Sequence, residues 1–128
     1  MVLVDTSVWI RALRGQAPFT DEIDRLLALD AVTGHDLVYG ELLIGDRGGR
    51  ANFLNKYESI HRADTVSHNF VVEFARGRQM NGRGAGWIDI HLLASAMVER
   101  LLLWTADSEL DALARELDVS YETRRRGV

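Results

Sequence analysis

The 128-residue sequence has no cysteine, one proline and one lysine. Without cysteine, the chain cannot form a disulfide scaffold, a thiol-dependent active site, a zinc ribbon or an iron–sulfur cluster. Its apolar runs are far shorter than the roughly 20 residues of a membrane span, and the opening residues 1–10 lack the basic stretch of a signal peptide. We therefore expect a cytoplasmic protein without membrane contact, in which residues 1–128 form a single domain.

The charged residues are unequal in number and in kind. The chain has 19 acidic and 15 basic residues, a net charge of −4 at pH 7, which argues against a general electrostatic attraction to nucleic acid. All basic residues except Lys56 are arginine, whose planar guanidinium suits bidentate contact with phosphate. Local arginine clusters could therefore still bind a polyanion, although the triplet at 124–126 is expected to be a solvated tail.

Short apolar runs alternate with helical patterns along the chain. Helices are expected to include one capped by Thr20, one over 35–45 after a break at Gly34, and one over 87–100. This alternation predicts right-handed βαβ units and hence an α/β fold, a three-layer α/β/α sandwich with a central parallel sheet. The expected strands are 1–4, 31–33, 59–62, 101–104 and 119–122.

Two aspartates follow predicted strands. Asp5 comes directly after the apolar run 1–4, and Asp107 closes the segment that begins at 101. The carboxyl ends of parallel strands meet at one edge of a sheet, which is where ligands of such folds bind. Either aspartate could also simply cap the helix that follows it, which is the commoner explanation for a single aspartate at such a junction.

Two more acids stand among apolar residues. Glu41 lies in YGELLIG, beside Leu42, Leu43 and Ile44, so we expect its helix to be largely buried; Asp89 lies in WIDIHLLASA. A solvated glutamate and an aspartate that stabilises a helix N-terminus are the alternatives. Carboxylates in apolar surroundings must be paired, protonated or bound to a cation. Because no lysine is near them in sequence, a hard-oxygen site for Mg²⁺ or Mn²⁺ is the simplest interpretation.

Four segments together resemble a known family. VDTSVWI at 4–10, YGELLIG at 39–45, WIDIHLLASA at 87–96 and LWTADSEL at 103–110 are similar, in order and spacing, to the four acidic motifs of PIN-domain ribonucleases, and most of all to the VapC toxins of bacterial toxin–antitoxin pairs. The resemblance implies an acidic pocket in which three aspartates bind metal and the glutamate completes the cluster. Its residues are Asp5, Glu41, Asp89 and Asp107, with Asp5, Asp89 and Asp107 as the metal ligands.

The resemblance extends to supporting residues around this pocket. Thr6 and Ser7 match the polar pair after the first aspartate, and Thr105 matches the threonine of the fourth motif; their hydroxyls would hold a carboxylate or a water in place. Glu109 is an additional acid, so the fourth ligand position is open between Asp107 and Glu109. The aromatic residue that often follows the fourth acid in this family is Leu110 here.

The implied function is hydrolysis of RNA phosphodiesters with one or two Mg²⁺ or Mn²⁺ ions. The resemblance further implies a homodimeric toxin that a small VapB-like antitoxin neutralises. Arginines near the Glu41 and Asp89 segments would form a rim that contacts the RNA backbone, with solvated helix ends as the alternative. These RNA-binding candidates are Arg47, Arg50, Arg78 and Arg83.

Other classes of protein remain open at this stage. A receiver-like regulatory domain would have an acidic pocket at the same sheet edge, but it needs a lysine after a late strand, and Lys56 is in mid-chain. A catalytically inactive PIN domain acting as a binding module is the second alternative. The histidines form no HExxH motif, so zinc is not expected. The aromatic residues Trp9, Phe19 and Trp87 are expected in the core. The alternative that the resemblance implies is a place at the antitoxin or dimer interface.

Overall fold

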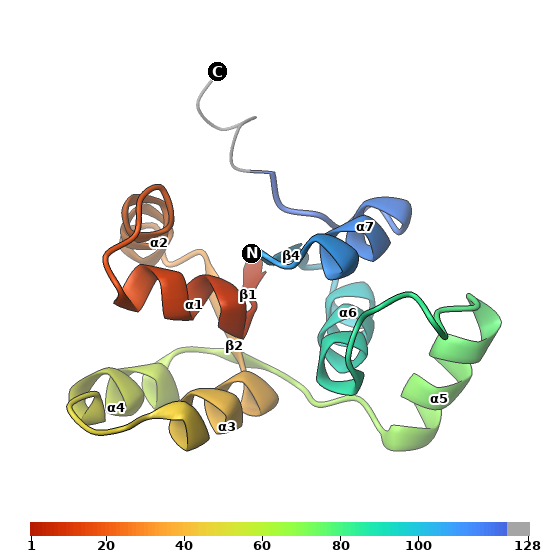
Figure 1. Cartoon of the computed structure of the whole chain (residues 1–128), viewed down its shortest axis with the longest axis horizontal. Coiled ribbons are helices and arrows are strands. Elements are labelled where there is room, and N and C mark those ends of the chain that lie inside the picture. Colours follow the sequence, from red (N-terminus) through yellow and green to blue (C-terminus); the bar gives the residue numbers. More distant parts are fainter. Residues whose placement is uncertain (123–128) are drawn as a thin grey trace.

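The computed structural model describes residues 1–122, so the arginine triplet at 124–126 lies outside the described residues. Strands and helices alternate along the chain (Figure 1), and most of the helices are short. In chain order they are β1 (Val2–Val4), α1 (Thr6–Leu13), α2 (Phe19–Ala28), β2 (Val32–His35), α3 (Asp36–Gly45), α4 (Ala51–Ser59), β3 (Arg62–Ala63), α5 (His68–Gly77), α6 (Trp87–Glu99), β4 (Leu102–Trp104) and α7 (Ser108–Glu116).

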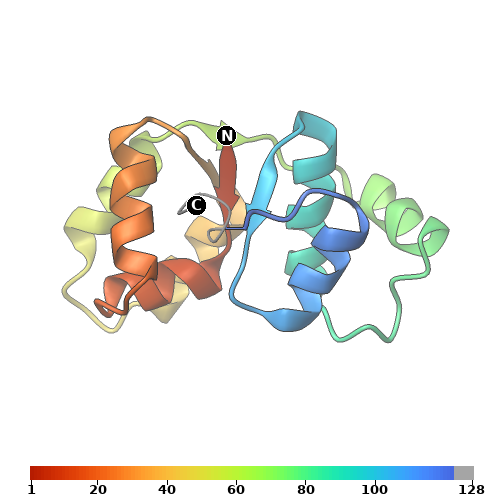
Figure 2. The same cartoon turned by 90° about the horizontal axis from the view of Figure 1, so that it is seen from above.

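The sheet is parallel, with the strand order β3-β2-β1-β4. Val2 of β1 pairs with Val32 on one side and with Leu102 on the other, so β1 is an interior strand, as its continuous apolar sequence predicts. Figure 2 shows α1 to α4 on one side of the sheet and α5 to α7 on the other. The predicted three-layer α/β/α sandwich is therefore confirmed.

The aromatic residues divide between core and surface. Trp9 is buried, with its ring centroid 5.4 Å from that of Phe53 and 5.6 Å from that of Tyr57, as predicted. Phe19 is partly buried, and its ring stacks on that of Trp104 in β4. Trp87, in contrast, is 45% exposed, so its placement in the core was wrong. It is the first residue of α6, and its ring centroid lies 5.4 Å from that of His68 and 5.2 Å from that of His91.

Two local predictions were wrong because tertiary contacts override the sequence signal. Thr20 does not cap α2, which already begins at Phe19; its hydroxyl donates to the carbonyls of Ala12 and Gln16 instead. Gly34 does not break the chain but lies inside β2, paired with Arg62. A Cβ atom at Gly34 would come within 3.1 Å of the Arg62 side chain, so glycine is needed there for close approach of the neighbouring strand.

The ends of the sheet are shorter than expected. The segment predicted as a strand over 59–62 pairs only at Arg62–Ala63, and the segment 119–122 forms a single parallel bridge between Ser120 and Leu103. Within residues 1–122, no helix combines the length and the apolar character needed to cross a bilayer.

Candidate active site

Asp5 is the central carboxylate at the carboxyl end of the sheet. It follows β1 directly, is only 4% exposed, and caps α1 by accepting a 2.7 Å hydrogen bond at Oδ1 from the backbone N–H of Thr6. Its other oxygen, Oδ2, accepts hydrogen bonds from the hydroxyls of Ser7 (2.8 Å) and Thr105 (2.7 Å). Three hydrogen-bond donors around one carboxylate hold it in a single orientation, and the helix-capping alternative coexists with this position in the cluster.

Ser7 and Thr105 also fix the loop that follows β4. Ser7 Oγ accepts a 3.0 Å hydrogen bond from the N–H of Ala106, and Thr105 Oγ1 accepts one of 3.0 Å from the N–H of Asp107. The two hydroxyls lie 3.3 Å apart. The loops after β1 and β4 are thereby joined, which sets the distance between the first and the fourth acid.

Glu41 reaches the cluster from α3 through a contact with α1. The hydroxyl of Thr6 donates a 2.6 Å hydrogen bond to Glu41 Oε1. The expectation of a largely buried helix around Glu41 is wrong, because α3 buries Val38 and Leu42 but leaves Leu43 47% and Ile44 86% exposed. Glu41 is itself exposed, so the bond from Thr6, and not an apolar environment, determines where its carboxylate lies.

Asp89 is the carboxylate whose ionisation is most affected by its surroundings. It stands in the first turn of α6, where Oδ2 accepts a 3.0 Å hydrogen bond from the N–H of Gly86. Burial raises the pKa of Asp89 above its usual value of 3.8; the Gly86 N–H opposes this, and the negative charges of Asp5, Asp107 and Glu41 raise the pKa further. The four predicted acids are thus close enough to repel one another electrostatically.

Asp107 and Glu109 occupy different positions at the start of α7. Asp107 caps the helix, because its Oδ1 accepts hydrogen bonds from the N–H groups of Glu109 (2.9 Å) and Leu110 (3.2 Å). The exposed side chain of Glu109 turns toward the loop before α6, where its Cγ would lie 2.9 Å from a Cβ atom built on Gly84. Since the charge of Asp107 acts on Asp89, the geometry favours Asp107 as the fourth acid of the cluster.

The four acids have the chemistry of a divalent-metal site. Within residues 1–122, none of them forms an ion pair with a basic side chain. Asp89 and Asp107 each use one oxygen as a cap and leave Asp89 Oδ1 and Asp107 Oδ2 without a donor in the described part of the chain. No three acidic or histidine side chains of residues 1–122 already form a compact metal cage. Carboxylate oxygens are nevertheless the kind of donor that hard divalent cations take.

The four arginines proposed for RNA contact do not form one rim. Arg47 and Arg50 belong to the loop between α3 and α4, whereas Arg78 follows α5, and Figure 1 shows these elements on opposite sides of the molecule. The guanidinium of Arg78 lies 5.4 Å from the ring of Phe74. Arg83 forms an ion pair with Glu116 of α7, so its charge is already compensated. Sequence reasoning missed Arg14, which shares a cavity with Arg47 and Arg50.

Comparison with known proteins identifies the family. The PIN domain model matches residues 2–116. Ribonuclease VapC32 from two Mycobacterium tuberculosis strains, CDC 1551 and H37Rv, is 36% identical to this chain over 121 residues, which is 94% of this chain and 95% of the relative.

A solved structure agrees at the level of the fold. The crystal structure of PAE2754 from Pyrobaculum aerophilum superposes with a TM-score of 0.63 at 18% sequence identity, and the match covers 98% of this chain and 90% of that one. Fold, acidic cluster and sequence similarity lead to one conclusion: the chain belongs to the PIN-domain family and, within it, to the VapC ribonucleases.

Proposed function

We propose that this chain is a metal-dependent endoribonuclease that hydrolyses RNA phosphodiesters and is the toxin of a type II toxin–antitoxin pair. The observation that carries the proposal is the gathering of four carboxylates: Asp5 and Asp107 follow β1 and β4, Thr6 bonds Glu41, and the charges of Asp5, Asp107 and Glu41 act on Asp89. No basic side chain of residues 1–122 is paired to these acids, so the site is suited to a bound cation.

Asp5, Asp89 and Asp107 would hold the metal, with Glu41 completing the cluster. One or two Mg²⁺ or Mn²⁺ ions bound there would lower the pKa of a coordinated water and offset the negative charge that develops on the phosphate. The chain itself then needs no nucleophilic side chain. Asp5 is held by the hydroxyls of Ser7 and Thr105, so its role is to present a fixed carboxylate to the cation.

The other acids have roles set by their surroundings. The Asp89 carboxyl, with its raised pKa, would release any proton it carries when a cation arrives, because the cation stabilises the ionised form. Glu41 Oε1 accepts the hydrogen bond of Thr6, which leaves Oε2 for the cation or for a water beside it. Glu109 would modify the charge at the edge of the site without belonging to it.

The partners follow from family membership. We propose an RNA substrate, a small VapB-like antitoxin that covers the acidic cluster, a homodimer, and a site of action in the cytoplasm. The similarity to proteins named ribonuclease VapC32 supports the first two. Leu43 and Ile44 are adjacent, exposed apolar side chains on α3, and contiguous exposed apolar surface is typical of an interface with another chain.

The proposed reaction is tested by incubating total bacterial RNA with the purified, antitoxin-free protein and Mg²⁺ or Mn²⁺. Parallel reactions contain EDTA or the Asp89→Asn variant. We expect discrete fragments that are lost in both controls. If the folded wild-type protein produces no fragments with either metal, the alternative of a PIN domain that only binds its partners takes the place of the nuclease.

A further inference from the structure

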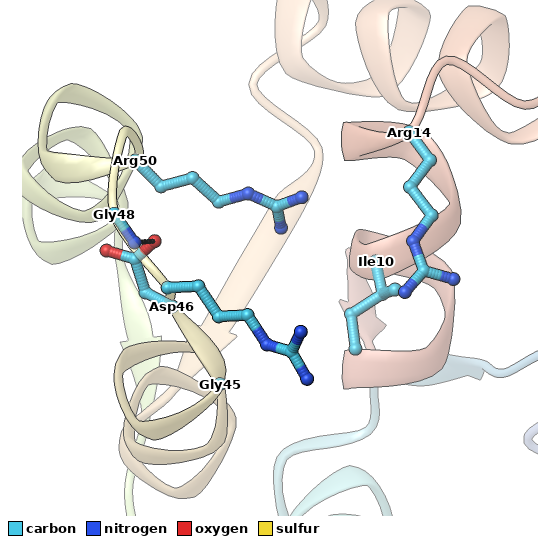
Figure 3. Close-up of a pocket in the computed structure, with 7 residues that line it drawn as sticks. Ile10, Arg14, Gly45, Asp46, Gly48 and Arg50 are labelled. Atoms are coloured by element: carbon cyan, nitrogen blue, oxygen red, sulfur yellow. Dashed lines mark hydrogen bonds between the residues drawn. The ribbon is translucent and has the colours of Figure 1, made fainter.

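A cavity of about 400 Å³ lies between the C-terminal end of α1 and the loop joining α3 to α4. Three arginines line it, Arg14, Arg47 and Arg50, against one carboxylate, that of Asp46. Figure 3 shows Arg50 extending across the opening toward α1, where Arg14 lies along the helix beside Ile10. Within residues 1–122, none of these three guanidiniums has a hydrogen bond or an ion pair.

The loop that carries two of these arginines is shaped by its own backbone. Asp46 Oδ1 accepts a 3.0 Å hydrogen bond from the N–H of Gly48, which closes a tight turn. Gly48 and Gly49 have φ values of +116° and +92°, a region that glycine adopts without strain. The turn brings Arg47 and Arg50 to the same cavity, and it occupies one oxygen of the Asp46 carboxylate, the only acid among the lining residues.

The cavity and the acidic cluster lie beside the same two helices, α1 and α3. Thr6 and Ile10 are four residues apart on α1, and Glu41 and Gly45 are four apart on α3, so each pair lies on one helix face. Thr6 donates its hydrogen bond to Glu41 in the first turn of α1, and Ile10 and Gly45, one turn later on their helices, line the cavity. At 1.5 Å per residue, the cavity is therefore about 6 Å further along the two helices than the Thr6–Glu41 contact.

We propose that this cavity is a subsite for a backbone phosphate of the RNA strand whose scissile phosphate lies at the acidic cluster. The proposal rests on the nuclease function above. A net-acidic protein can hold a polyanion only where positive charge is concentrated, and three unpaired guanidiniums provide that charge together with bidentate hydrogen-bond donors. Because the cavity and Glu41 are about one helical turn apart along α1 and α3, one strand can reach both, and the contact is independent of base sequence.

The test is a binding measurement in the Asp89→Asn background, in which the RNA is not cut. The probe is a fluorescein-labelled single-stranded oligoribonucleotide of about twelve nucleotides, titrated at several salt concentrations. Arg14→Gln, Arg47→Gln and Arg50→Gln should each weaken binding about threefold to tenfold. The triple variant should reduce the slope of log K against log salt by about 0.7, the value for one phosphate contact. Lys56→Gln removes the same charge from the exposed face of α4, outside the cavity, and should change neither quantity.

A second measurement locates the phosphate. In oligoribonucleotides with one neutral methylphosphonate linkage, a single position should weaken binding to the protein that retains the three arginines and have no effect on the triple variant. Unchanged affinity and salt slope in the arginine variants overturn the subsite, even if the wild-type protein cleaves RNA. The same holds if the variants keep their RNA affinity but lose affinity for a polyglutamate peptide, since the cavity would then accept an acidic protein segment. Failure of the nuclease proposal is separate, because it appears only as absent cleavage by the wild-type protein.

Discussion

The hydroxyl of Thr105 donates a 2.7 Å hydrogen bond to Asp5 Oδ2, across 100 positions of sequence. The same Thr105 oxygen accepts a hydrogen bond from the N–H of Asp107. One side chain therefore links the first acid of the cluster to the backbone of the fourth. The orientation of the Asp5 carboxylate depends on this link because Asp5 forms no ion pair within residues 1–122.

Thr105→Val should impair catalysis by leaving Asp5 less well oriented. The valine has nearly the same shape but no hydroxyl, and loss of such an outer hydrogen bond typically reduces metal affinity or activity about 10-fold to 100-fold. The measurement is the cleavage rate against Mn²⁺ concentration, whose half-maximal point should rise. Thr105→Ser keeps the hydroxyl and should restore most of the wild-type behaviour. A valine variant with an unaltered metal dependence would show that Thr105 does not position Asp5.

Asp89→Asn should abolish cleavage without lowering stability at pH 7. Burial first, and then the charges of Asp5, Asp107 and Glu41, raise the pKa of Asp89, so the ionised carboxylate is unfavourable in the folded protein at pH values above that pKa. Asparagine removes the charge, and its carbonyl can still accept the hydrogen bond from the N–H of Gly86.

Thermal unfolding with and without Mn²⁺ checks this expectation. The variant should melt at or above the wild-type temperature in EDTA. The difference should shrink as the pH falls toward 3.8, because the folded wild-type carboxyl takes up its proton above that value. Mn²⁺ should raise the melting temperature of the wild type and have little effect on the variant, since a ligand stabilises only the state that binds it. A variant that melts well below the wild type would instead assign Asp89 a structural role.

The sequence predicted those parts of the site that depend on chain order. Asp5 and Asp107 follow apolar strands, and parallel strands bring their carboxyl ends to one edge of the sheet. The exposure of Glu41 could not be predicted from the sequence. It depends on which face of α3 packs against α1 and not on the apolar character of Leu43 and Ile44. The periodicity of α3 is weak, with apolar residues on all sides, so it did not indicate the buried face.

The arginines illustrate the same limit. Arg83 is compensated by Glu116, which is 33 positions away, and Arg14 meets Arg47 and Arg50 only because the α3–α4 loop turns back toward α1. Such pairings depend on tertiary geometry, and neither composition nor local spacing encodes them. For Arg14 the sequence offers a partial signal: its i, i+4 spacing from Ile10 and Thr6 places it on the helix face that carries the Thr6 hydroxyl. That spacing does not indicate Arg47 and Arg50 as its neighbours.

Stability should decrease below pH 6.5 because of His35. This imidazole is fully buried; Nδ1 accepts the N–H of Leu37 at 3.1 Å, and Nε2 lies 3.0 Å from Ser95 Oγ. Burial lowers the pKa of His35 below 6.5, an effect that nearby charges modify in both directions. As the pH falls through 6.5, the imidazole of the unfolded chain binds a proton while that of the folded chain stays neutral. The free energy of unfolding should therefore fall by up to about 1.4 kcal/mol per pH unit until the pH reaches the pKa of His35 in the folded protein.

Urea unfolding at a series of pH values between 7.5 and 5 measures this dependence. His35→Asn is the matched control, because asparagine can accept the same hydrogen bond at the start of α3 but does not titrate. The variant should be less stable overall and show a smaller pH dependence. His91, whose pKa is also lowered by burial, titrates in both proteins, and its charge lowers the pKa of His35. The difference in slope therefore reports His35 together with this interaction. If the free energy of unfolding has the same pH dependence in both proteins, His35 binds its proton as readily in the folded protein as in the unfolded chain.

Glu116→Gln should increase RNA binding by releasing Arg83. Arg83 and Glu116 form an ion pair between the loop before α6 and α7, and the hydrogen bond from Arg83 lowers the pKa of the Glu116 carboxyl. In the wild-type protein this compensation leaves Arg83 little attraction for phosphate, so Arg83→Gln should reduce the RNA affinity less than Arg50→Gln does.

Without the glutamate, Arg83 becomes a free cation on the Asp89 side of the site, and the salt slope should steepen by up to about 0.7, the value for one additional phosphate contact. The double variant Arg83→Gln with Glu116→Gln should return to the wild-type affinity; if it binds as tightly as Glu116→Gln alone, the gain comes from the lost negative charge and not from Arg83.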